Sequence, residues 1–455
     1  MDVQKAKNIF FLGIGGIGMS AIARYFHQKG INVSGYDKTY SKITNDLEEE
    51  GIPIVYTDET NTISKEIDLV IWTPAIKPTH PIYQHFKIKT TSILKRSEVL
   101  GQLTHSYKTI AVAGTHGKTT VATLIAHIFN SSDLGCSAFL GGISTNFKSN
   151  FLYNPNSQFC VVEADEFDRS FLRLNPFISV ITSCDADHLD IYEDAADLRA
   201  TFSSFAAKTN PKGVLFVKKG LPLYLPATPK NYNYSINESA DFNSTNIQFD
   251  GNKTSFNFNF SQQRIEDLIS YFPGEHNIEN ATAAIAVAAW AGISTGHIRA
   301  ALESFKGVKR RFEYIINEPD LVFIDDYAHH PEELRAVILS LKSMYPGQNI
   351  TGIFQPHLYS RTRDFAEEFG KNLSLLDDLL LLDIYPARED PIEGIDSAML
   401  LGKVVIKNKT LIKKEELISG TALKNKNLQI VITLGAGDIS TLVEPLRVTL
   451  LKQKG

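Results

Sequence analysis

A chain of 455 residues is too long for one hydrophobic core, so two to four domains are expected. Its 43% apolar and 21% charged residues are typical of a globular protein, and its net charge of −5 excludes broad binding to nucleic acid. Three cysteines are too few for a disulfide framework, and neither a secretion signal nor an apolar run of membrane-spanning length is present. These features predict a cytoplasmic multidomain enzyme without membrane insertion.

A first segment, residues 1–106, begins as a buried strand, a glycine turn and an amphipathic helix in NIFFLGIGGIGMSAIARYF. Gly13, Gly15 and Gly18 fit the pattern G-x-G-x-x-G, and Asp37 ends the next predicted strand, where a ribose-binding carboxylate would stand. Taken alone, the motif indicates NAD, but backbone N–H groups at such a turn bind any diphosphate. Arg96, near the end of the segment, is either a solvated helix charge, the commoner case, or a ligand contact.

The stretch AVAGTHGKTT, residues 111–120, joins an apolar strand to an apolar helix through a glycine-rich turn. Gly114 and Gly117 allow backbone N–H groups to converge on one point, Lys118 can reach terminal phosphates, and the Thr119 hydroxyl can hold Mg²⁺. The general P-loop pattern would place glycine where this chain has Val112. The alternative is an ordinary strand–turn–helix corner, but the G-K-T-T run favours a phosphate-binding loop.

Two further apolar strands end in acidic clusters. QFCVVEADEFDRSFL carries the first cluster and FISVITSCDADHLDIY the second, and their members are Glu163, Asp165, Glu166 and Asp168, then Asp185, Asp187, His188 and Asp190. One such cluster would be interpreted as a solvated acidic loop. Two clusters at the sheet edge that carries the phosphate loop predict a metal-assisted phosphoryl-transfer site.

The segment PGEHNIENATAAIAVAAWAG predicts a helix after a Pro-Gly turn. Asn280 in this helix could hydrogen-bond an adenine edge, since an amide offers a donor and an acceptor side by side. Asn277 is equally well explained as a helix cap. The strands and turns of residues 211–262 are assigned no chemistry, and the basic run GVKRRFE marks a hinge into a third domain.

A third segment, residues 309–455, contains a βαβ series with polar residues at strand ends, in LVFIDDYAHHP and NITGIFQPHLYSRTRDF. The paired histidines His329 and His330 could indicate a metal. Neither a carboxylate nor a cysteine stands at ligand spacing, and Arg361 and Arg363 would repel a cation. The positive residues therefore favour a carboxylate or phosphate ligand.

Taken in order, GIGGIGMS, AVAGTHGKTT, EADEFDRSFL, DADHLDIY, PGEHNIENA, GVKRRFE, DDYAHHP and FQPHLYSRTRDF resemble the Mur ligase family over essentially the whole chain. The resemblance implies an α/β protein of three domains. These are a Rossmann-like UDP-sugar-binding domain at 1–106, a central P-loop-type ATPase α/β domain at 107–308, and a Rossmann-like C-terminal domain at 309–455 that completes the amino-acid and ATP sites.

The implied activity is ATP-dependent ligation of L-alanine to the lactyl carboxylate of UDP-N-acetylmuramate through an acyl phosphate, in peptidoglycan precursor synthesis. The implied cofactors are ATP and Mg²⁺, and the implied partners are the two small substrates, with no nucleic acid. We expect a monomer or a weak homodimer. The nearest rival is the recycling branch of the family, which joins a tripeptide to the same UDP-sugar. A nucleotide sensor and an NAD dehydrogenase are rivals of other classes, and neither accounts for the intact phosphate loop and metal ligands.

The resemblance also implies residue roles. The phosphates of ATP would be wrapped by Gly114, Thr115, His116, Gly117, Lys118, Thr119 and Thr120, with catalytic Lys118 stabilising the transferred charge. Thr119 and Glu163 would bind one Mg²⁺, and catalytic His188 a second metal. The uridine diphosphate would lie on Gly15, Gly16, Gly18 and Asp37, which replaces the NAD interpretation.

The remaining implied roles fall on the helix at 275–290 and on the third segment. Asn280 would contact adenine, Asp326 the ribose of ATP, and Arg311 the γ-phosphate. Alanine and its approach to the acyl phosphate would be held by Tyr327 and by catalytic His329 and Arg361.

Two departures from the family pattern and the form of the D-H motif carry information. Later-acting branches carry a lysine, modified to a carbamate, shortly after the D-H motif, and residues 189–207 contain none. This absence fits the alanine-adding branch. The motif S-C-D-A-D-H differs from the N-L-E-F-D-H form of the recycling branch. Leu358 stands where some relatives carry arginine, which leaves the division of roles between Arg361 and Arg363 open.

Overall fold

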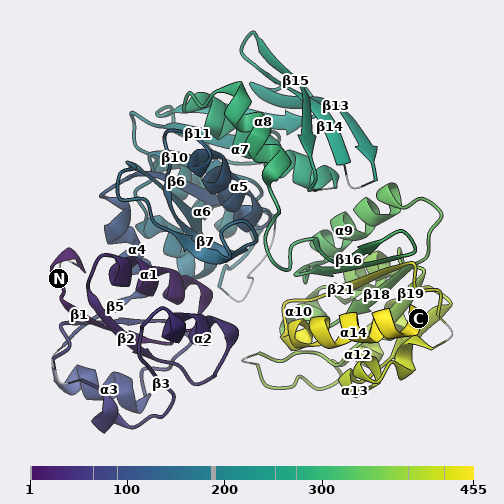
Figure 1. Cartoon of the computed structure of the whole chain (residues 1–455), viewed down its shortest axis with the longest axis horizontal. Helices are drawn as coiled ribbons and strands as arrows, with labels where there is room; N and C mark the ends of the chain where they lie inside the picture. Colours follow the sequence, from purple (N-terminus) through teal and green to yellow (C-terminus); the bar gives the residue numbers. More distant parts are fainter. Residues whose placement is uncertain are drawn as a thin grey trace. The chain divides into compact units, whose positions relative to one another are not determined.

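The computed structural model describes residues 3–64, 66–89, 91–185, 191–251, 253–272, 274–387, 389–424 and 426–454. Three β-sheets covered by helices form the fold (Figure 1). The chain divides into two compact units, of which the first comprises Met1–Ile247, Phe256–Ile269 and Glu279–Lys306 and the second Gln248–Ser255, Ser270–Ile278 and Gly307–Gly455.

The first sheet of unit 1 has the strand order β3-β2-β1-β4-β5, and its neighbouring strands run parallel. Its strands are β1 (Asn8–Leu12), β2 (Asn32–Tyr36), β3 (Ile54–Val55), β4 (Leu69–Trp72) and β5 (Ser92–Lys95). Its helices are α1 (Ile17–Gln28), α2 (Lys42–Glu49), α3 (Pro81–Ile88) and α4 (Arg96–Thr104). The run NIFFL of β1 is almost wholly buried, as expected for a parallel strand covered on both faces.

The second sheet of unit 1 has the order β15-β14-β13-β12-β11-β10-β6-β9-β7-β8. Its strands are β6 (Lys108–Ala113), β7 (Ser137–Ser144), β8 (Ser149–Leu152), β9 (Phe159–Ala164), β10 (Ile178–Ile181), β11 (Val214–Lys218), β12 (Lys230–Ile236), β13 (Phe242–Asp250), β14 (Lys253–Phe260) and β15 (Gln263–Ser270). Its helices are α5 (Lys118–Asn130), α6 (Ala195–Ala207), α7 (Glu275–Trp290) and α8 (Thr295–Ser304). β6 lies between β9 and β10 and pairs with both in parallel, which brings their carboxyl ends to one edge.

Helix α1 joins the two sheets of unit 1, since it contacts β7 and β8 of the second sheet as well as β2 of the first (Figure 1). The ring of Tyr25 lies 5.6 Å from Phe139, 6.3 Å from Phe151 and 5.9 Å from Tyr153. One continuous hydrophobic cluster therefore includes buried residues of both sheets.

The sheet of unit 2 has the order β16-β17-β21-β18-β19-β20. Its strands are β16 (Glu313–Glu318), β17 (Leu321–Asp326), β18 (Ile350–Phe354), β19 (Asp378–Leu381), β20 (Asn408–Leu411) and β21 (Ile430–Leu434). Its helices are α9 (Pro331–Met344), α10 (Tyr359–Asp364), α11 (Ala366–Leu373), α12 (Ser397–Lys403), α13 (Lys414–Ile418) and α14 (Val443–Lys454). Only β16 pairs antiparallel among the paired strands described, so the carboxyl ends of the other five share one edge.

Elements that carry predicted site residues are confirmed: β6 leads into α5, β9 leads into the first acidic cluster, and Pro331 is the first residue of α9. β10 leads toward Asp185, and Asp187, His188 and Asp190 lie outside the described residues. No helix in the described part of the chain is long and apolar enough to cross a membrane.

Candidate active site

The phosphate loop is built on two glycines that no other residue could replace without strain. Gly114 has φ +142°, and a Cβ on it would lie 2.0 Å from Thr182 Oγ1. Gly117 is the residue before α5, with φ +81°, and a Cβ on it would lie 2.6 Å from Asn280 Oδ1. The loop joins β6 to α5 and turns tightly past Thr182, which follows β10, and past Asn280 on α7. This close packing explains the short G-x-x-G spacing. Asn280 therefore lies against the loop.

Lys118, the first residue of α5, is held inside the loop. Its Nζ donates to the carbonyl oxygen of Gly114 at 2.5 Å and lies 2.8 Å from Glu166 Oε2. Burial lowers the pKa of Lys118, but the carboxylates of Glu166, Asp165 and Glu163 outweigh burial, so the pKa is raised above its ordinary value. The lysine is thus cationic at neutral pH, as a phosphate-binding group must be.

Residues that follow β10 form hydrogen bonds with the loop, a role that no sequence motif indicated. Ser183 Oγ accepts from the N–H of His116 at 2.7 Å and from Thr115 Oγ1 at 3.0 Å. Thr182 Oγ1 donates to the carbonyl oxygen of His116. The His116 ring lies 3.9 Å from Asp185 Oδ2, measured from Nε2. The S-C-D run therefore shapes the turn as well as preceding the D-H motif.

Glu163, the predicted Mg²⁺ ligand, stands on β9 opposite Val112 of β6. Its Oε2 accepts from the N–H of Gly141 at 3.0 Å. Within the residues that the structure describes, no three His, Cys, Asp or Glu side chains are grouped to hold a metal. His188, the predicted second ligand, lies outside the described residues. A hydroxyl and one carboxylate remain a suitable protein contribution for Mg²⁺, which usually keeps several waters.

The glycine turn after β1 is closed by Asp37, whose Oδ2 accepts from the N–H of Gly15 at 2.8 Å. A cavity of about 290 Å³ lies beside this turn, within unit 1. Gly16, Gly18 and Arg96 line one part of it, and Glu163 and Asp165 line another. Arg96 Nη2 is 3.6 Å from Asp165 Oδ2, so this guanidinium faces the cavity rather than bulk solvent alone.

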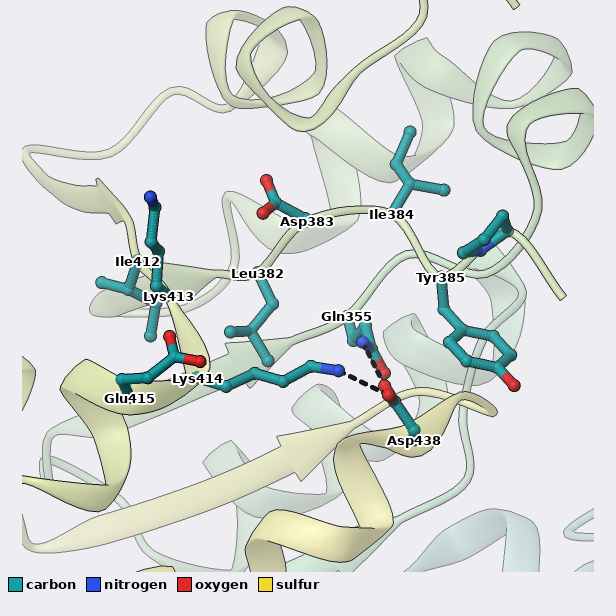
Figure 2. A pocket seen from close by; sticks show the side chains of 11 residues that line it. Gln355, Leu382, Asp383, Ile384, Tyr385, Ile412, Lys413, Lys414, Glu415 and Asp438 are labelled. Atoms are coloured by element: carbon teal, nitrogen blue, oxygen red, sulfur yellow. Dashed lines mark hydrogen bonds and ion pairs between the residues drawn. The ribbon is translucent and has the colours of Figure 1, made fainter. Parts of the chain in front are cut away.

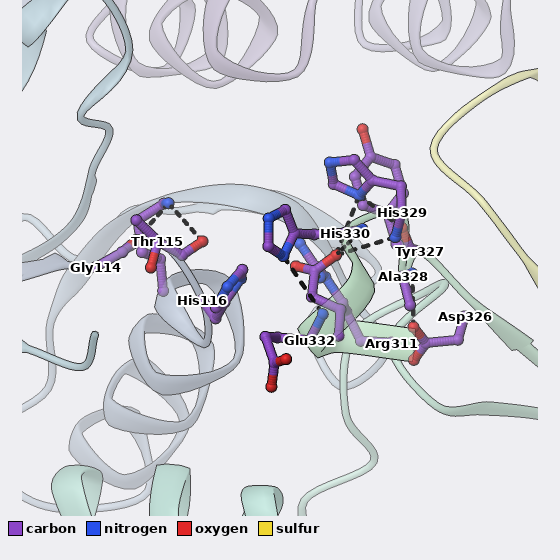
Figure 3. Close-up of polar contacts among 12 residues, drawn as sticks. Gly114, Thr115, His116, Arg311, Asp326, Tyr327, Ala328, His329, His330 and Glu332 are labelled. Atoms are coloured by element: carbon purple, nitrogen blue, oxygen red, sulfur yellow. Dashed lines mark hydrogen bonds and ion pairs between the residues drawn. The ribbon is translucent and has the colours of Figure 1, made fainter. Parts of the chain in front are cut away.

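In unit 2, Asp326 ends β17 and is 5% exposed. Its Oδ2 accepts from the N–H of Phe312 at 2.7 Å. Its Oδ1 accepts from the N–H of Ala328, also at 2.7 Å (Figure 3). Burial raises the pKa of Asp326 to about 6, against the effect of Arg311 and of these two N–H groups. Arg311 lies over the ring of Tyr327, with Cζ 4.9 Å from the centroid.

The remaining predicted residues of unit 2 occupy the same sheet edge. His329 Nδ1 is 3.0 Å from the carbonyl oxygen of Tyr327 and 3.3 Å from Glu333 Oε2. Arg361 on α10 is 8% exposed, whereas Arg363 is half exposed and pairs with Asp364 at 2.7 Å. The two arginines therefore differ: only Arg361 is held within the fold.

A cavity of about 460 Å³ opens at the carboxyl ends of β18, β19, β20 and β21 (Figure 2). Asp438 binds Lys414 Nζ at 2.5 Å and Gln355 Nε2 at 2.8 Å on its wall. Tyr385, also on the wall, stacks on His357 with ring centroids 5.7 Å apart. Sequence patterns did not single out Gln355, Lys414 or Asp438, because these residues lie in three separate segments of the chain.

These features define a multidomain α/β nucleotide-binding protein with an acid-flanked phosphate loop. Three models match the chain: "Mur ligase family, catalytic domain" at residues 8–108, "Mur ligase middle domain" at 112–288, and "Mur ligase, glutamate ligase domain" at 310–437. The chain belongs to the Mur ligase family. The predicted family is thereby confirmed.

Several relatives match nearly the whole chain, and two of them illustrate the similarity. A UDP-N-acetylmuramate–L-alanine ligase of Parabacteroides distasonis is 47% identical over 461 residues, covering 100% of this chain and 99% of the relative. An enzyme of the same name from Flavobacterium psychrophilum is 48% identical over 447 residues, covering 97% and 98%.

Solved structures confirm the predicted three-domain α/β fold class. The UDP-N-acetylmuramate–alanine ligase of Thermotoga maritima has a TM-score of 0.84 at 26% identity, over 98% of this chain and 100% of its own. A murein peptide ligase of Psychrobacter arcticus has a TM-score of 0.72 at 21% identity, over 98% of both chains, and shows the fold alone.

Proposed function

We propose that this chain joins L-alanine to the lactyl carboxylate of UDP-N-acetylmuramate at the expense of ATP, in peptidoglycan precursor synthesis. Full-length relatives at 47% and 48% identity carry this activity in their names. The observation that carries the proposal within the structure is Lys118, 13% exposed and paired with Glu166, at the end of the loop that joins β6 to α5. β6 lies between β9 and β10 in the sheet. That arrangement neutralises the charge of a transferred phosphoryl group.

The chemistry requires two steps. A carboxylate is a poor electrophile, so an oxygen of the lactyl carboxylate first attacks the γ-phosphorus, and ADP leaves. The alanine amine then attacks the carbonyl carbon of the acyl phosphate, and the tetrahedral intermediate expels inorganic phosphate. Positioning and charge neutralisation supply most of the rate in such reactions.

We propose the following roles for residues of unit 1. Residues 114–120 hold the phosphates of ATP, and Lys118 stabilises the charge on the transferred group. Asn280 contacts adenine from its place beside Gly117. Gly15, Gly16, Gly18 and Asp37 receive the uridine diphosphate; Asp37 does so while closing the glycine turn. Mg²⁺ would be held by Thr119 and Glu163 and would screen the charge of the phosphates, with His188 as a further ligand.

In unit 2, we propose that Asp326 binds the ribose of ATP and Arg311 the γ-phosphate. Tyr327, His329 and Arg361 hold L-alanine. The burial of Arg361 and the surface pairing of Arg363 with Asp364 favour Arg361 for the alanine carboxylate. We retain the domain limits 1–106, 107–308 and 309–455 for these roles. Because ATP and nucleotide sugars are cytoplasmic metabolites, we place the enzyme in the cytoplasm. We also propose that it is a monomer or a weak homodimer.

The decisive experiment measures ADP release with ATP, Mg²⁺ and UDP-N-acetylmuramate, in the presence of L-alanine, L-serine, glycine or the tripeptide L-alanyl-γ-D-glutamyl-meso-diaminopimelate. We expect turnover with L-alanine and none with the tripeptide. Turnover with the tripeptide alone would assign the chain to the recycling branch and overturn the proposal. L-alanine and glycine differ by one methyl group. The ratio of their kcat/KM values should therefore correspond to about 1–3 kcal/mol of discrimination.

A further inference from the structure

Asn150 on β8 is a fully buried amide that connects the second sheet of unit 1, the central sheet, to helix α1. Its Oδ1 accepts from Arg24 Nη1 at 2.6 Å. Its Nδ2 donates to the carbonyl oxygen of Ile17 at 2.5 Å and to Ser20 Oγ at 3.0 Å. All three partners belong to α1, so one side chain of the central sheet holds three successive points of this helix.

An amide is well suited to this position. It offers one carbonyl acceptor and two N–H donors, and both donors and the acceptor are used here. A buried donor or acceptor without a partner costs about 1–3 kcal/mol, so neither an aliphatic residue nor an acid of the same size would serve. The network extends further, because Arg24 also pairs with Glu50 at the end of α2 at 2.8 Å.

The point of attachment is next to the glycine turn. Ile17 is the first residue of α1 and follows Gly16 directly. Elsewhere α1 packs on the central sheet through apolar contacts, which include the rings of Tyr25, Phe139 and Phe151 and are less directional than hydrogen bonds. The hydrogen bonds of Asn150 have narrow limits of distance and angle and therefore fix the position of α1 along the sheet.

This position determines the shape of the cavity beside the turn. The cavity is lined by Gly16 and Gly18 from α1 and the turn before it, and by Gly141 and Glu163 from β7 and β9. A shift of α1 would change the separation between the glycine turn and Glu163. In the proposed reaction, this separation must match the span between the diphosphate of the UDP-sugar and its lactyl carboxylate.

We infer that Asn150 is a positioning residue, which sets the distance between the diphosphate-binding turn and the phosphoryl-transfer site. The inference rests on the proposed function. A displacement of about 1 Å at a reacting centre costs on the order of 100-fold in rate. Asn150 touches no substrate in this scheme, so its loss should affect UDP-sugar turnover and leave ATP binding intact.

The test compares Asn150→Asp and Asn150→Ala with wild type. The aspartate keeps an acceptor for Arg24 but places a carboxylate oxygen against the carbonyl oxygen of Ile17. We expect kcat/KM for UDP-N-acetylmuramate to fall about 10- to 100-fold in both variants. The Kd for a non-hydrolysable ATP analogue should stay within about twofold, since the phosphate loop lies on β6 and α5.

Asn257→Ala is the matched control. Asn257 is also buried, and its Oδ1 accepts from the N–H of Asp267 at 2.9 Å at the opposite end of the same sheet. It should lower the unfolding temperature and leave the kinetic constants unchanged. The inference is overturned if the Asn150 variants keep wild-type kcat/KM, or if they lose ATP-analogue binding and UDP-sugar turnover in equal measure.

Ser20→Ala covers the case in which the Asn150 variants do not fold. It removes one of the three attachment points, and we expect a smaller fall in the same constant, about two- to fivefold, by loss of a single hydrogen bond. An unchanged constant would overturn the inference. Failure of the proposed function is distinguishable, because wild type itself would then release no ADP with UDP-N-acetylmuramate and L-alanine.

Discussion

Lys118 Nζ and Glu166 Oε2 lie 2.8 Å apart, with side chains that are 13% and 1% exposed. A buried ion pair contributes little net stability, because desolvation of both charges offsets most of their attraction. The ion pair instead fixes the relative position of two chain segments. The pair ties the start of α5 to the turn after β9, and the hydroxyl of Tyr192 holds that turn by donating to the carbonyl oxygen of Glu166 at 2.6 Å.

The first prediction concerns the protonation of Lys118. In Glu166→Gln the strongest carboxylate partner is lost, so the lowering effect of burial gains weight and the pKa of Lys118 falls. We expect kcat to fall about 10- to 100-fold by loss of a charged hydrogen bond. The alkaline limb of the pH–rate profile should move to lower pH.

Asp168→Asn is the control for this variant. Asp168 belongs to the same acidic cluster, but it is half exposed and lies 3.5 Å from Lys95 Nζ. Its φ of +54° is tolerated by asparagine. The control should keep the wild-type profile. An unshifted alkaline limb in Glu166→Gln would show that Glu166 does not maintain the charge of Lys118.

The second prediction separates catalysis from stability. Lys118→Met should abolish ligation and leave UDP-sugar binding intact, as titration calorimetry would show. It also leaves Glu166 buried without its cation, at a cost of about 3–5 kcal/mol in unfolding free energy. The double variant Lys118→Met/Glu166→Gln should recover most of that stability in urea unfolding without recovering activity. Turnover in either variant would refute the phosphate role of Lys118.

The third prediction tests the metal role of Glu163. Glu163→Gln keeps an acceptor for the N–H of Gly141, so the fold should be unchanged. Loss of the carboxylate charge should raise the Mg²⁺ concentration for half-maximal activity at least tenfold, an expectation on the order of 1.4 kcal/mol or more. Nucleotide binding without Mg²⁺ should match wild type. An unchanged Mg²⁺ titration would count against Glu163 as a ligand.

The sequence was sufficient to predict the framework of the site. β6, the glycine turn and α5 follow from one motif, and β9 and β10 from apolar runs that end in acids, because a parallel sheet brings carboxyl ends together. The sequence motifs did not predict which residue pairs with Lys118. Glu166 is one of four acids in its cluster, and the turn that selects it has positive φ at Asp168 and Arg169, where neither residue type demands it.

Long-range polar contacts could also not be predicted from the sequence. Asn150 in the run SNFL has the same local pattern as an asparagine on an exposed strand, and its three partners lie 126 to 133 residues away. Ser183 precedes a recognisable acidic cluster, yet its bond to the N–H of His116 depends on the register of β10 against β6. Motifs predict which backbone segments meet, whereas packing decides which side chains pair.

The fourth prediction concerns the pH dependence of stability. Burial raises the pKa of Asp326 from 3.8 to about 6, so the folded chain binds a proton more tightly than the unfolded chain. The resulting cost of keeping the carboxylate ionised is fully present above pH 6 and disappears below pH 3.8. The difference between the two pKa values, 6 − 3.8 = 2.2, corresponds to about 3 kcal/mol.

Asp326→Asn removes this titration. The amide loses one of the two bonds to the N–H groups of Phe312 and Ala328, so it should be less stable than the protonated wild type by about 1–3 kcal/mol. Urea unfolding between pH 4 and 7.5 should show wild type gaining about 2–2.5 kcal/mol over the variant as the pH falls. Glu332→Gln, at an exposed position, should follow the wild-type curve. A constant difference between wild type and Asp326→Asn across this range would show that Asp326 titrates in the folded chain as it does in water.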